Sequence, residues 1–449
     1  MFPEWRGPGR EVAVIGLGKS GGAAARLLRH HGIAVYASDG GSGPTLDSQA
    51  AVLRAAGVEV ELGGHDLERI GRAVAAVVSP GVPPDAAALR VAREAGVPVL
   101  AESELGLRCL ASSRTLAITG TNGKTTTTAL TAHLLVTAGL RAVAAGNIGQ
   151  PLSAVALEPE PPEWIAAELS SFQLHGMPSL APTAGVLTNL SPDHLDRYPT
   201  LQDYYADKAL LFRNATPGST WITNADDAEV ERMVEGVPGR HQQFSVRRPA
   251  DAWYDREAGQ LMLAGVAVLP RSELMLLGDH NVANALAASL AVRMAGVRLE
   301  AVAEGLRSFR ALPHRLEPVR EVGGVLWIND SKATNIASTE VALNALDRPY
   351  VLLLGGRHKG ESYQRLAPVL APRCRAIVAY GEAAPLVDGD LGGSVKVVRA
   401  GTFAEVLATA RGLAEPGDAI LLSPACSSYD MFRNYEERGA EFRAGVESL

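Results

Sequence analysis

A glycine-containing loop between a predicted strand and a predicted helix carries the residues best suited to phosphate chemistry. It reads Thr119-Gly120-Thr121-Asn122-Gly123-Lys124-Thr125-Thr126-Thr127. In such a loop the backbone N–H groups bind phosphate oxygens, and the N-terminus of the following helix adds a positive field. Lys124 can neutralise the β- and γ-phosphates of a nucleotide, and the Thr125 hydroxyl can bind Mg²⁺. A turn that binds nothing is the weaker interpretation, because strand, loop, Lys-Thr pair and helix all agree.

A second glycine-rich turn lies near the N-terminus. Gly16-Leu17-Gly18-Lys19-Ser20-Gly21 follows a predicted strand and opens a predicted helix, and Asp39 ends the next strand. This spacing is typical of the dinucleotide-binding fingerprint, in which glycines let phosphate approach the backbone and the acid holds a ribose or a base. The turn therefore predicts a nucleotide-type ligand. NAD and a turn without ligand remain open, although no partner for hydride transfer stands out elsewhere.

Three further polar residues occupy positions with two interpretations each. Glu168 ends an apolar run at residues 164–167; a carboxylate there either caps the strand or, downstream of a phosphate loop, binds Mg²⁺. His194 lies in a polar Asp-His-x-Asp loop, where a lone histidine is either structural or a ligand. Asn147 lies between glycines in a turn that it could simply cap.

The spacing of short apolar runs predicts parallel sheets in a chain of several α/β domains. The first segment has predicted strands at residues 11–16, 34–39, 75–79 and 98–102 and a predicted helix at residues 21–31. A strand at residues 115–119 and a helix at residues 125–138 start a second domain, and strands at residues 323–328, 350–354, 376–380 and 419–422 predict a third sheet. We expect domains at residues 1–111, 112–311 and 312–449.

Composition and charge restrict the class of protein. Hydrophobic residues make up 47% and charged residues 20% of the chain, as in globular proteins. A net charge of −7 disfavours binding along a nucleic acid backbone. The three cysteines form no disulfide or metal-binding pattern, and neither a signal peptide nor a bilayer-spanning apolar stretch is found. The cysteine usage fits a reducing cytoplasm, and we expect no membrane insertion; separately, we expect a monomer.

Beyond the phosphate loop, further motifs follow in a familiar order. They are Glu168-Leu169-Ser170-Ser171-Phe172-Gln173-Leu174, Asn189-Leu190-Ser191-Pro192-Asp193-His194-Leu195-Asp196-Arg197, Lys208, Gly278-Asp279-His280-Asn281-Val282-Ala283-Asn284, Leu312-Pro313-His314-Arg315, Asn329-Asp330-Ser331-Lys332-Ala333-Thr334-Asn335 and Ser423-Pro424-Ala425-Cys426-Ser427-Ser428. Over nearly the whole chain these motifs resemble those of the Mur ligases, and several resemble the D-glutamate-adding branch. The resemblance implies a Rossmann-like N-terminal UDP-binding domain, a central P-loop ATPase-like domain with a parallel sheet, and a Rossmann-like C-terminal domain.

The resemblance also implies a reaction. The D-glutamate-adding branch uses ATP and Mg²⁺, expected at two sites, to join D-glutamate to UDP-N-acetylmuramoyl-L-alanine in peptidoglycan precursor synthesis. An amide can form in water if ATP first activates the carboxylate as an acyl phosphate, which the amine then attacks. Because ATP contacts are expected from two segments, the C-terminal domain is expected to close onto the central one.

The resemblance implies a role for each motif residue. The implied ATP-binding residues are Gly120, Thr121, Asn122, Gly123, Lys124, Thr125, Thr126, Thr127, Asn281, Asn284, Arg315 and Asp330. The implied metal ligands are Thr125, Glu168, His194 and Lys208. The UDP substrate is assigned Gly18, Lys19, Ser20, Asp39, Ser79, Gly81 and Asn147, and D-glutamate is assigned Lys332, Thr334, Lys359, Ser428 and Tyr435. The implied catalytic set is Lys124, Lys208, His194 and Asn147, and Cys426 is expected to pack, since acyl phosphate chemistry needs no thiol.

Lys208 is the residue for which the two lines of reasoning differ. From the sequence alone it is a surface lysine paired with Asp203 or Asp207. The resemblance implies instead that its side-chain nitrogen is carbamylated. A carbamate supplies an anionic oxygen ligand of the kind that Mg²⁺ prefers, whereas an ammonium has no lone pair to offer.

Two positions depart from the family pattern. Gly40-Gly41-Ser42-Gly43 follows Asp39 where the D-glutamate-adding enzymes usually offer hydroxyl and Arg contacts, which puts the uracil contacts in doubt. Tyr435 stands where Phe is common, so the D-glutamate pocket is expected to gain a hydroxyl.

Three alternative functions stay open. They are a sibling amide ligase (a folylpolyglutamate synthase or another Mur step), a nucleotide-binding regulatory module and an NAD oxidoreductase. The joint presence of Lys124, Thr125, Glu168, His194 and Lys208 counts against a decayed site.

Overall fold

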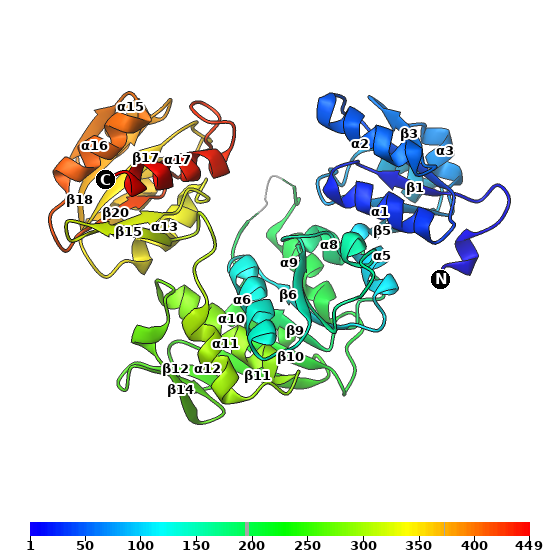
Figure 1. The fold of residues 1–449 in the computed structure, drawn as a ribbon, viewed down its shortest axis with the longest axis horizontal. Helices are drawn as coiled ribbons and strands as arrows, with labels where there is room; N and C mark the ends of the chain where they lie inside the picture. The colour runs from blue at the N-terminus through cyan, green and yellow to red at the C-terminus, as the bar shows by residue number, and fades with distance from the viewer. Residues whose placement is uncertain (194–196, 372) are drawn as a thin grey trace. The chain divides into compact units, whose positions relative to one another are not determined.

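The computed structural model describes residues 1–193, 197–371 and 373–449. Three α/β sheets follow one another along the chain, each with helices packed on it (Figure 1). By their contacts the described residues divide into two compact units: Met1–Glu273 with Ala283–Ser308, and Leu274–Val282 with Phe309–Leu449. The first unit holds two sheets and the second unit holds the third. The predicted three-domain α/β fold class is confirmed.

The N-terminal sheet has five parallel strands in the order β3-β2-β1-β4-β5. The strands are β1 (Val12–Ile15), β2 (Val35–Asp39), β3 (Glu59–Leu62), β4 (Ala75–Val78) and β5 (Val99–Ala101). The four predicted strands are found within their predicted ranges. Val12 and Val14 belong to one apolar cluster and Ala13 and Ile15 to another, so both faces of the sheet are covered. In a doubly wound sheet, a ligand binds at the carboxyl ends of the strands where the order reverses.

The central sheet has nine strands in the order β14-β13-β12-β11-β10-β9-β6-β8-β7. The strands are β6 (Arg114–Thr119), β7 (Ala142–Gly146), β8 (Trp164–Glu168), β9 (Ala184–Leu187), β10 (Thr220–Asn224), β11 (Arg240–Ser245), β12 (Ala252–Asp255), β13 (Gln260–Leu263) and β14 (Val266–Pro270). They are parallel from β7 to β12, and β13 and β14 add an antiparallel hairpin. The predicted strand before the phosphate loop is β6, which lies between β8 and β9.

The C-terminal sheet has six strands in the order β15-β16-β20-β17-β18-β19. The strands are β15 (Glu317–Val322), β16 (Val325–Asn329), β17 (Tyr350–Gly355), β18 (Cys374–Tyr380), β19 (Val397–Ala400) and β20 (Ala419–Leu422). Only β15 pairs antiparallel with its neighbour. All four strands predicted for this sheet are found, as β16, β17, β18 and β20.

Helices connect and cover these strands. In the first unit and at its border they are α1 (Lys19–His30), α2 (Pro44–Ala55), α3 (Leu67–Arg72), α4 (Ala87–Glu94), α5 (Glu102–Cys109), α6 (Lys124–Thr137), α7 (Leu152–Val155), α8 (Ser171–His175), α9 (Leu201–Ala209), α10 (Ala228–Val234), α11 (Asp279–Arg293) and α12 (Leu299–Ser308). The second unit adds α13 (Ile336–Ala345), α14 (Ala367–Leu370), α15 (Ala384–Leu391), α16 (Phe403–Leu413) and α17 (Tyr435–Glu447). Short 3₁₀ helices are η1 (Pro3–Trp5), η2 (Leu210–Phe212), η3 (Arg271–Glu273) and η4 (Tyr363–Leu366).

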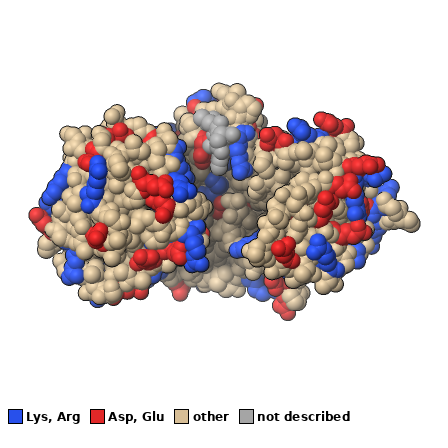
Figure 2. Space-filling model, turned by 90° about the horizontal axis from the view of Figure 1, so that it is seen from above, with Lys and Arg blue, Asp and Glu red and all other residues tan. Residues whose placement is uncertain are grey.

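The face shown in Figure 2 has no single dominant charge. On the face shown in Figure 2, basic side chains are interspersed with acidic ones. Within the described ranges, no helix combines the length and apolar character needed to cross a membrane. All three cysteines carry free thiols.

Candidate active site

The phosphate loop has a shape that only glycine permits at two positions. Gly120 and Gly123 have φ angles of 140° and 82°, which residues with a Cβ rarely adopt. A Cβ at Gly120 would lie 2.0 Å from Thr188 Oγ1, and one at Gly123 would lie 2.3 Å from Asn284 Oδ1. Gly123 is also the N-cap of α6, so the turn directs the positive end of this helix at the place where a phosphate would bind.

A second loop, at residues 188–191, holds the phosphate loop in shape. The N–H of Thr121 donates to the carbonyl of Asn189 over 2.9 Å. The N–H of Asn122 donates to Asn189 Oδ1 over 2.9 Å, and Thr188 Oγ1 donates to the Asn122 carbonyl over 2.7 Å. Thr121 and Asn122 therefore shape the loop through their backbones.

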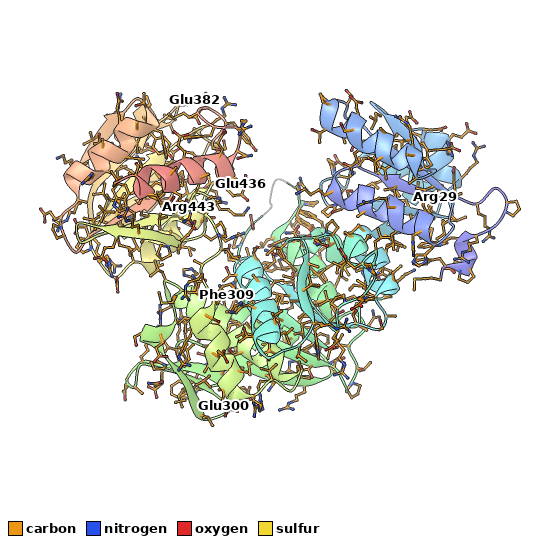
Figure 3. The ribbon with its side chains drawn as sticks, in the orientation of Figure 1. Arg29, Glu300, Phe309, Glu382, Glu436 and Arg443 are labelled. Carbon is orange, nitrogen blue, oxygen red and sulfur yellow. The ribbon has the colours of Figure 1, made fainter. Side chains whose placement is uncertain are left out.

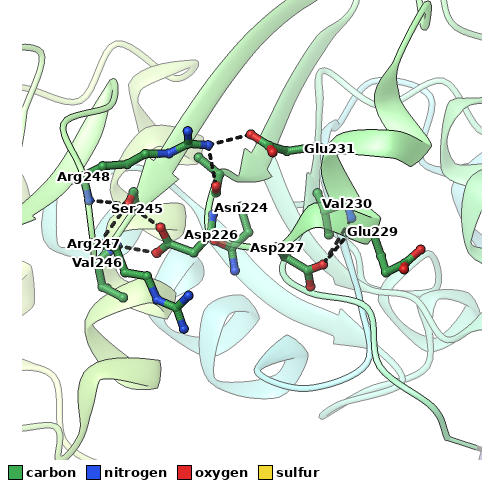
Figure 4. Close-up of polar contacts among 11 residues, drawn as sticks. Asn224, Asp226, Asp227, Glu229, Val230, Glu231, Ser245, Val246, Arg247 and Arg248 are labelled. Carbon is green, nitrogen blue, oxygen red and sulfur yellow. Dashed lines mark hydrogen bonds and ion pairs between the residues drawn. The ribbon is translucent and has the colours of Figure 1, made fainter.

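The loop at residues 188–191 is itself anchored by the turn after β10. Asn224 Nδ2 donates to the Thr188 carbonyl over 2.9 Å, and the N–H of Leu190 donates to Asp227 Oδ2 over 2.8 Å. Figure 4 shows the other oxygen of Asp227 capping α10 and Asp226 bound to the end of β11. The phosphate loop thus rests on a network that reaches two strands and a helix.

Lys124 folds back over the loop that carries it. Its Nζ donates to the carbonyls of Gly120 over 3.0 Å and Thr121 over 2.6 Å. Of the threonines that follow, Thr125 and Thr126 are half-buried, whereas Thr127 is buried and donates from Oγ1 to Asn284 Oδ1 over 3.2 Å.

Both asparagines predicted for ATP lie inside α11, which begins at Asp279, so neither is its N-cap. Asn284 contacts Thr127, as described above, and Asn281 is buried and donates from Nδ2 to the Leu277 carbonyl over 2.8 Å.

Glu168 is a buried carboxylate with one oxygen held and the other unpartnered. It ends β8 opposite Ile118, just before the phosphate loop, and is 2% exposed. Asn147 Nδ2 donates to its Oε1 over 2.8 Å. Among the described residues, its Oε2 has no hydrogen-bond partner. A buried carboxylate oxygen in this state is unfavourable unless a cation binds it, and Mg²⁺ takes such oxygens. The site therefore fits Mg²⁺.

Lys208, in α9, is 1% exposed, so its interpretation as a surface lysine is wrong. Asp203 and Asp207 interact elsewhere, with Thr200 and with Tyr198 and His175. The physical reason is that α9 packs Lys208 inward, while Asp203 is exposed and Asp207 is partly buried against Tyr198 and His175.

The environment of Lys208 favours a neutral amine. Burial, and next the charge of Lys124, lower the pKa of Lys208 well below its usual value. Its Nζ lies 4.8 Å from the ring centre of Tyr204, whose hydroxyl donates to Thr121 Oγ1 over 3.2 Å. A neutral amine is the form that can react with CO₂. His194, also predicted as a metal ligand, lies outside the described residues.

All seven residues predicted for the UDP substrate line one cavity of about 650 Å³. They are Gly18, Lys19, Ser20, Asp39, Ser79, Gly81 and Asn147. The cavity lies at the carboxyl ends of β1, β2 and β4, where the doubly wound order reverses, and is completed by the turn after β7. Lys19 opens α1, so the positive end of a helix also lies at this cavity.

Two of the lining residues also hold the glycine turn in place. Asp39 accepts from the N–H of Leu17 over 2.7 Å and from the N–H of Gly41 over 2.8 Å, one with each oxygen. Ser79 Oγ donates to the Gly16 carbonyl over 2.8 Å. Asp39 therefore organises the turn in addition to any contact with a ligand.

In the second unit, Asp330 fixes the turn that carries Arg315. The N–H of Leu316 donates to Asp330 Oδ1 over 3.1 Å, and Ser423 Oγ donates to Oδ2 over 2.8 Å. Burial raises the pKa of Asp330 to about 7. His314 and Leu316, on either side of Arg315, have positive φ angles of 64° and 42°. Both oxygens of Asp330 already accept hydrogen bonds within the chain. Asp330 therefore positions the turn of Arg315, in addition to any contact with a ribose.

The five residues predicted for D-glutamate come from three loops and the start of α17 in the second unit. Lys332 Nζ donates to Tyr435 Oη over 2.7 Å. Thr334 is half-buried two residues after Lys332, Ser428 is buried and Lys359 is exposed. The loop of Lys359 is bridged to that of Ser428 through the backbones of Arg357 and Ser427.

A buried arginine joins two of these loops. Arg438 of α17 is 0% exposed and donates from Nε to Ser331 Oγ over 2.9 Å and from Nη2 to the Ser331 carbonyl over 2.8 Å. Its Nη1 donates to the Cys426 carbonyl over 3.2 Å. Cys426 is fully buried and burial raises its thiol pKa, so it packs as expected. On the same helix, Arg443, which is labelled in Figure 3, forms an ion pair with Glu317 of β15.

Comparison with known proteins covers almost the whole chain. Residues 10–101, 118–292 and 314–426 match the families described as Mur ligase MurD-like, N-terminal domain; Mur ligase middle domain; and Mur ligase, glutamate ligase domain. A protein of Acidobacterium capsulatum is 42% identical over 441 residues, which cover 97% of this chain and 95% of the relative. The chain belongs to the Mur ligase family. The A. capsulatum relative, and one from Salinibacter ruber that is 42% identical over 98% of both chains, are named UDP-N-acetylmuramoylalanine--D-glutamate ligase.

Solved Mur ligase structures share the fold. UDP-N-acetylmuramate-alanine ligase MurC from Thermotoga maritima superposes with a TM-score of 0.61 at 19% identity, covering 98% of this chain and 99% of its own. MurF from Acinetobacter baumannii gives a TM-score of 0.63 at 17% identity, covering 97% of this chain and 93% of its own. Mur ligases are ATP-dependent, ADP-forming amide ligases that use Mg²⁺, and this chain is an enzyme of that class. The alternatives of an NAD oxidoreductase and of a regulatory module do not hold.

Several residues on which this Mur ligase site depends were not predicted as site residues. Asn189 stood in a predicted motif segment without a role, and Tyr204 was not singled out. Asp227 and Arg438 also act on partners far away in sequence; a helix N-cap signal could have found Asp227, whereas no local signal marks Arg438. His65, which also lines the cavity, follows a strand of a parallel sheet, so the rule that ligands bind at carboxyl ends could have found it.

Proposed function

We propose that this Mur ligase joins D-glutamate to UDP-N-acetylmuramoyl-L-alanine and converts ATP to ADP and phosphate. One observation carries the proposal: Asn147 lines the cavity and donates to Glu168, beside the phosphate loop, over 2.8 Å. A carboxylate at the end of a molecule bound in this cavity comes next to the phosphates of ATP. The names of the 42% identical relatives support D-glutamate as the amine.

The first step is attack of the alanyl carboxylate on the γ-phosphorus of ATP. The bond to the bridging oxygen breaks, ADP leaves with the electron pair, and an acyl phosphate remains. Lys124 and the positive end of α6 stabilise the charge on the phosphates. Direct contacts to the phosphates come from Gly123 and the residues that follow it. The amine of D-glutamate then attacks the acyl carbon, loses a proton and expels phosphate.

We assign the Mg²⁺ ligands to Thr125, Glu168, Lys208 and His194, at two sites. Bound Mg²⁺ neutralises phosphate oxygens and so makes the γ-phosphorus a better electrophile. The unpartnered oxygen of Glu168 supports this assignment. Lys208 acts as a carbamate: its neutral amine forms an N–C bond with CO₂ and releases a proton, and the buried, low-pKa amine supports this reaction.

We assign the second unit to D-glutamate and to part of ATP. Lys332 and Lys359 supply positive charge for the two carboxylates of D-glutamate, with Thr334, Ser428 and Tyr435 as hydrogen-bonding groups. Arg315 and Asp330 act at the phosphates and ribose of ATP, and Asn281 and Asn284 at its adenine. The tight Lys332–Tyr435 contact supports a shared pocket.

Phosphate release tests the proposed function. The full chain is mixed with ATP, Mg²⁺, UDP-N-acetylmuramoyl-L-alanine and one amino acid at a time, and folate with L-glutamate serves as the competing mixture. We expect release with D-glutamate and not with L-alanine or a diamino acid. Release with folate and L-glutamate alone would contradict the proposal and favour a folylpolyglutamate synthase.

We further propose that the enzyme acts in the cytoplasm as a monomer with domains at residues 1–111, 112–311 and 312–449. ATP and a UDP-linked precursor as substrates support that compartment. Light scattering at assay concentration tests the monomer, and a mass twice that of the chain would contradict it.

A further inference from the structure

The nucleotide cavity is lined by a histidine to which the proposed function gives no role. His65 lies in the loop after β3 and is half-buried. Its Nδ1 lies 2.8 Å from Oγ of Ser38, a residue of β2 that is 0% exposed. One ring nitrogen is therefore held by a buried partner, which fixes the plane of the imidazole and leaves Nε2 for another group.

The order of strands places this histidine at one end of the cavity. Since β3, β2, β1 and β4 are neighbours in that order, their loops present His65, then Asp39, then the glycine turn, then Ser79. Asn147, in the turn after β7 of the central sheet, also lines the cavity. The reacting carboxylate must lie near Asn147 and the diphosphate at the glycine turn and the start of α1. The nucleoside end of the substrate then falls on Asp39 and His65.

Gly40, which lies beside His65, has no side chain to cover the imidazole edge. A Cβ at Gly40 would lie 3.5 Å from His65 Nε2, so any side chain at this position would pack against the imidazole edge. Asp39 already accepts from two backbone N–H groups. At this end of the cavity, His65 therefore offers a base an open edge that carries a ring nitrogen, next to the carboxylate of Asp39.

We propose that His65 is a specificity-determining residue that binds the uracil of the UDP substrate through Nε2. The proposal rests on the proposed function for the identity of the nucleotide. Uracil offers an N–H donor between two carbonyl acceptors, and Nε2 of a neutral imidazole complements one or the other according to its tautomer. Cytosine replaces that N–H by an acceptor and one carbonyl by an amino group, so the same edge binds it differently.

Calorimetric binding of UDP and CDP to the full chain tests this role. The variants are His65→Phe, which keeps a ring but no nitrogen, and His65→Ala. His30→Phe is the matched control, because His30 is exposed at the end of α1 and does not line the cavity. We expect both His65 variants to bind UDP about tenfold more weakly and to lose the preference for UDP over CDP, as one lost base contact implies. KM values for ATP and D-glutamate stay unchanged.

A variant in which a new side chain covers the imidazole of His65 gives an independent test. Gly40→Val should weaken UDP binding as His65→Ala does, and the double variant should bind no worse than either single one, because both remove the same contact. If His65→Phe and His65→Ala keep the affinity and base preference of the unmodified chain, the proposal for His65 is wrong. If the unmodified chain binds neither UDP nor the muramoyl nucleotide, the proposed function fails instead.

Discussion

The guanidinium of Arg438 donates to both the hydroxyl and the carbonyl oxygen of Ser331, over 2.9 and 2.8 Å. This fork holds the loop of Lys332 to the helix that carries Tyr435. For Arg438→Lys we expect an increase of about tenfold in KM for D-glutamate, because a lysine has one donor group where the fork needs several. KM for the UDP substrate, which binds in the other unit, stays unchanged.

Arg433→Lys is the matched control for this change. Arg433 lies just before the same helix, and its side chain is 85% exposed and pairs with Glu437. We expect wild-type kinetics for it. A lower apparent kcat for Arg438→Lys with the KM of all three substrates unchanged would show a general loss of folded enzyme and would contradict a role in the D-glutamate loops.

Gly123→Ala should abolish ATP binding. Its φ of 82° disfavours any Cβ, and the new methyl would lie 2.3 Å from Asn284 Oδ1. Gly139→Ala is the control, since Gly139 has a φ of 83° but no atom within 4 Å of a Cβ. Both variants lose about 1 kcal/mol of stability through the backbone. Equal ATP affinity of the two variants in calorimetry would show that the clash does not matter.

Glu168→Gln should lower turnover about 100-fold and raise the Mg²⁺ concentration needed for half-maximal activity. The reason is that a neutral amide replaces the carboxylate whose Oε2 has no partner among the described residues. Nucleotide binding at the phosphate loop should persist. Glu163→Gln, at an exposed position before the same strand, is the control. An unchanged Mg²⁺ dependence for Glu168→Gln would remove Glu168 from the metal site.

Lys208→Ala should lose nearly all activity and still bind ATP. Acetate or another short carboxylate should restore part of the turnover by taking the place of the carbamate. Lys208→Arg should stay inactive, because a guanidinium does not form this carbamate. Labelled bicarbonate and nuclear magnetic resonance would detect the modified nitrogen directly. A fully active Lys208→Arg enzyme would exclude the carbamate.

Because of Glu102, the stability of the chain should fall as pH is raised from about 4.5 to 6. Its Oε1 accepts from the N–H of Ser153 over 2.6 Å and its Oε2 has no partner in the described chain. Burial raises its pKa from 4.5 to about 6, so in this window the folded chain holds a proton that the unfolded chain has lost. The free energy of unfolding therefore falls by up to about 2 kcal/mol as pH rises through this window. Above pH 6 this contribution no longer changes.

Glu102→Gln removes this titration. We expect a higher melting temperature than the parent chain at pH 8 and no gain at pH 4. Glu94→Gln, at an exposed position at the end of α4, should show neither effect. A gain at pH 4 as large as that at pH 8 would show that charge is not the cause.

Local patterns sufficed for those features that depend on sequence neighbours. The strand, loop and helix around Lys124 were predicted to within a residue, because apolar spacing, glycines and the Lys-Thr pair all act locally. The burial of Lys208 was not predicted from α9 itself, since its polar residues are typical of an exposed helix and tertiary packing decides which face turns inward. His65 and Arg438 depend on Ser38 and Ser331, which are 27 and 107 residues away, and such pairings are set by the order of strands. The hairpin of β13 and β14 was also not predicted.

The division into contact units bears on how fragments of this enzyme should be produced. The chain passes between the units three times, and residues 274–282 belong with the C-terminal sheet. Within that short segment, Leu277 packs against the C-terminal apolar core. A fragment cut at residue 312 would leave Leu277 behind and bare an apolar patch prone to self-association. Linking residues 274–282 directly to residue 309 would retain it, so this spliced design is the better starting point for expressing the C-terminal part alone.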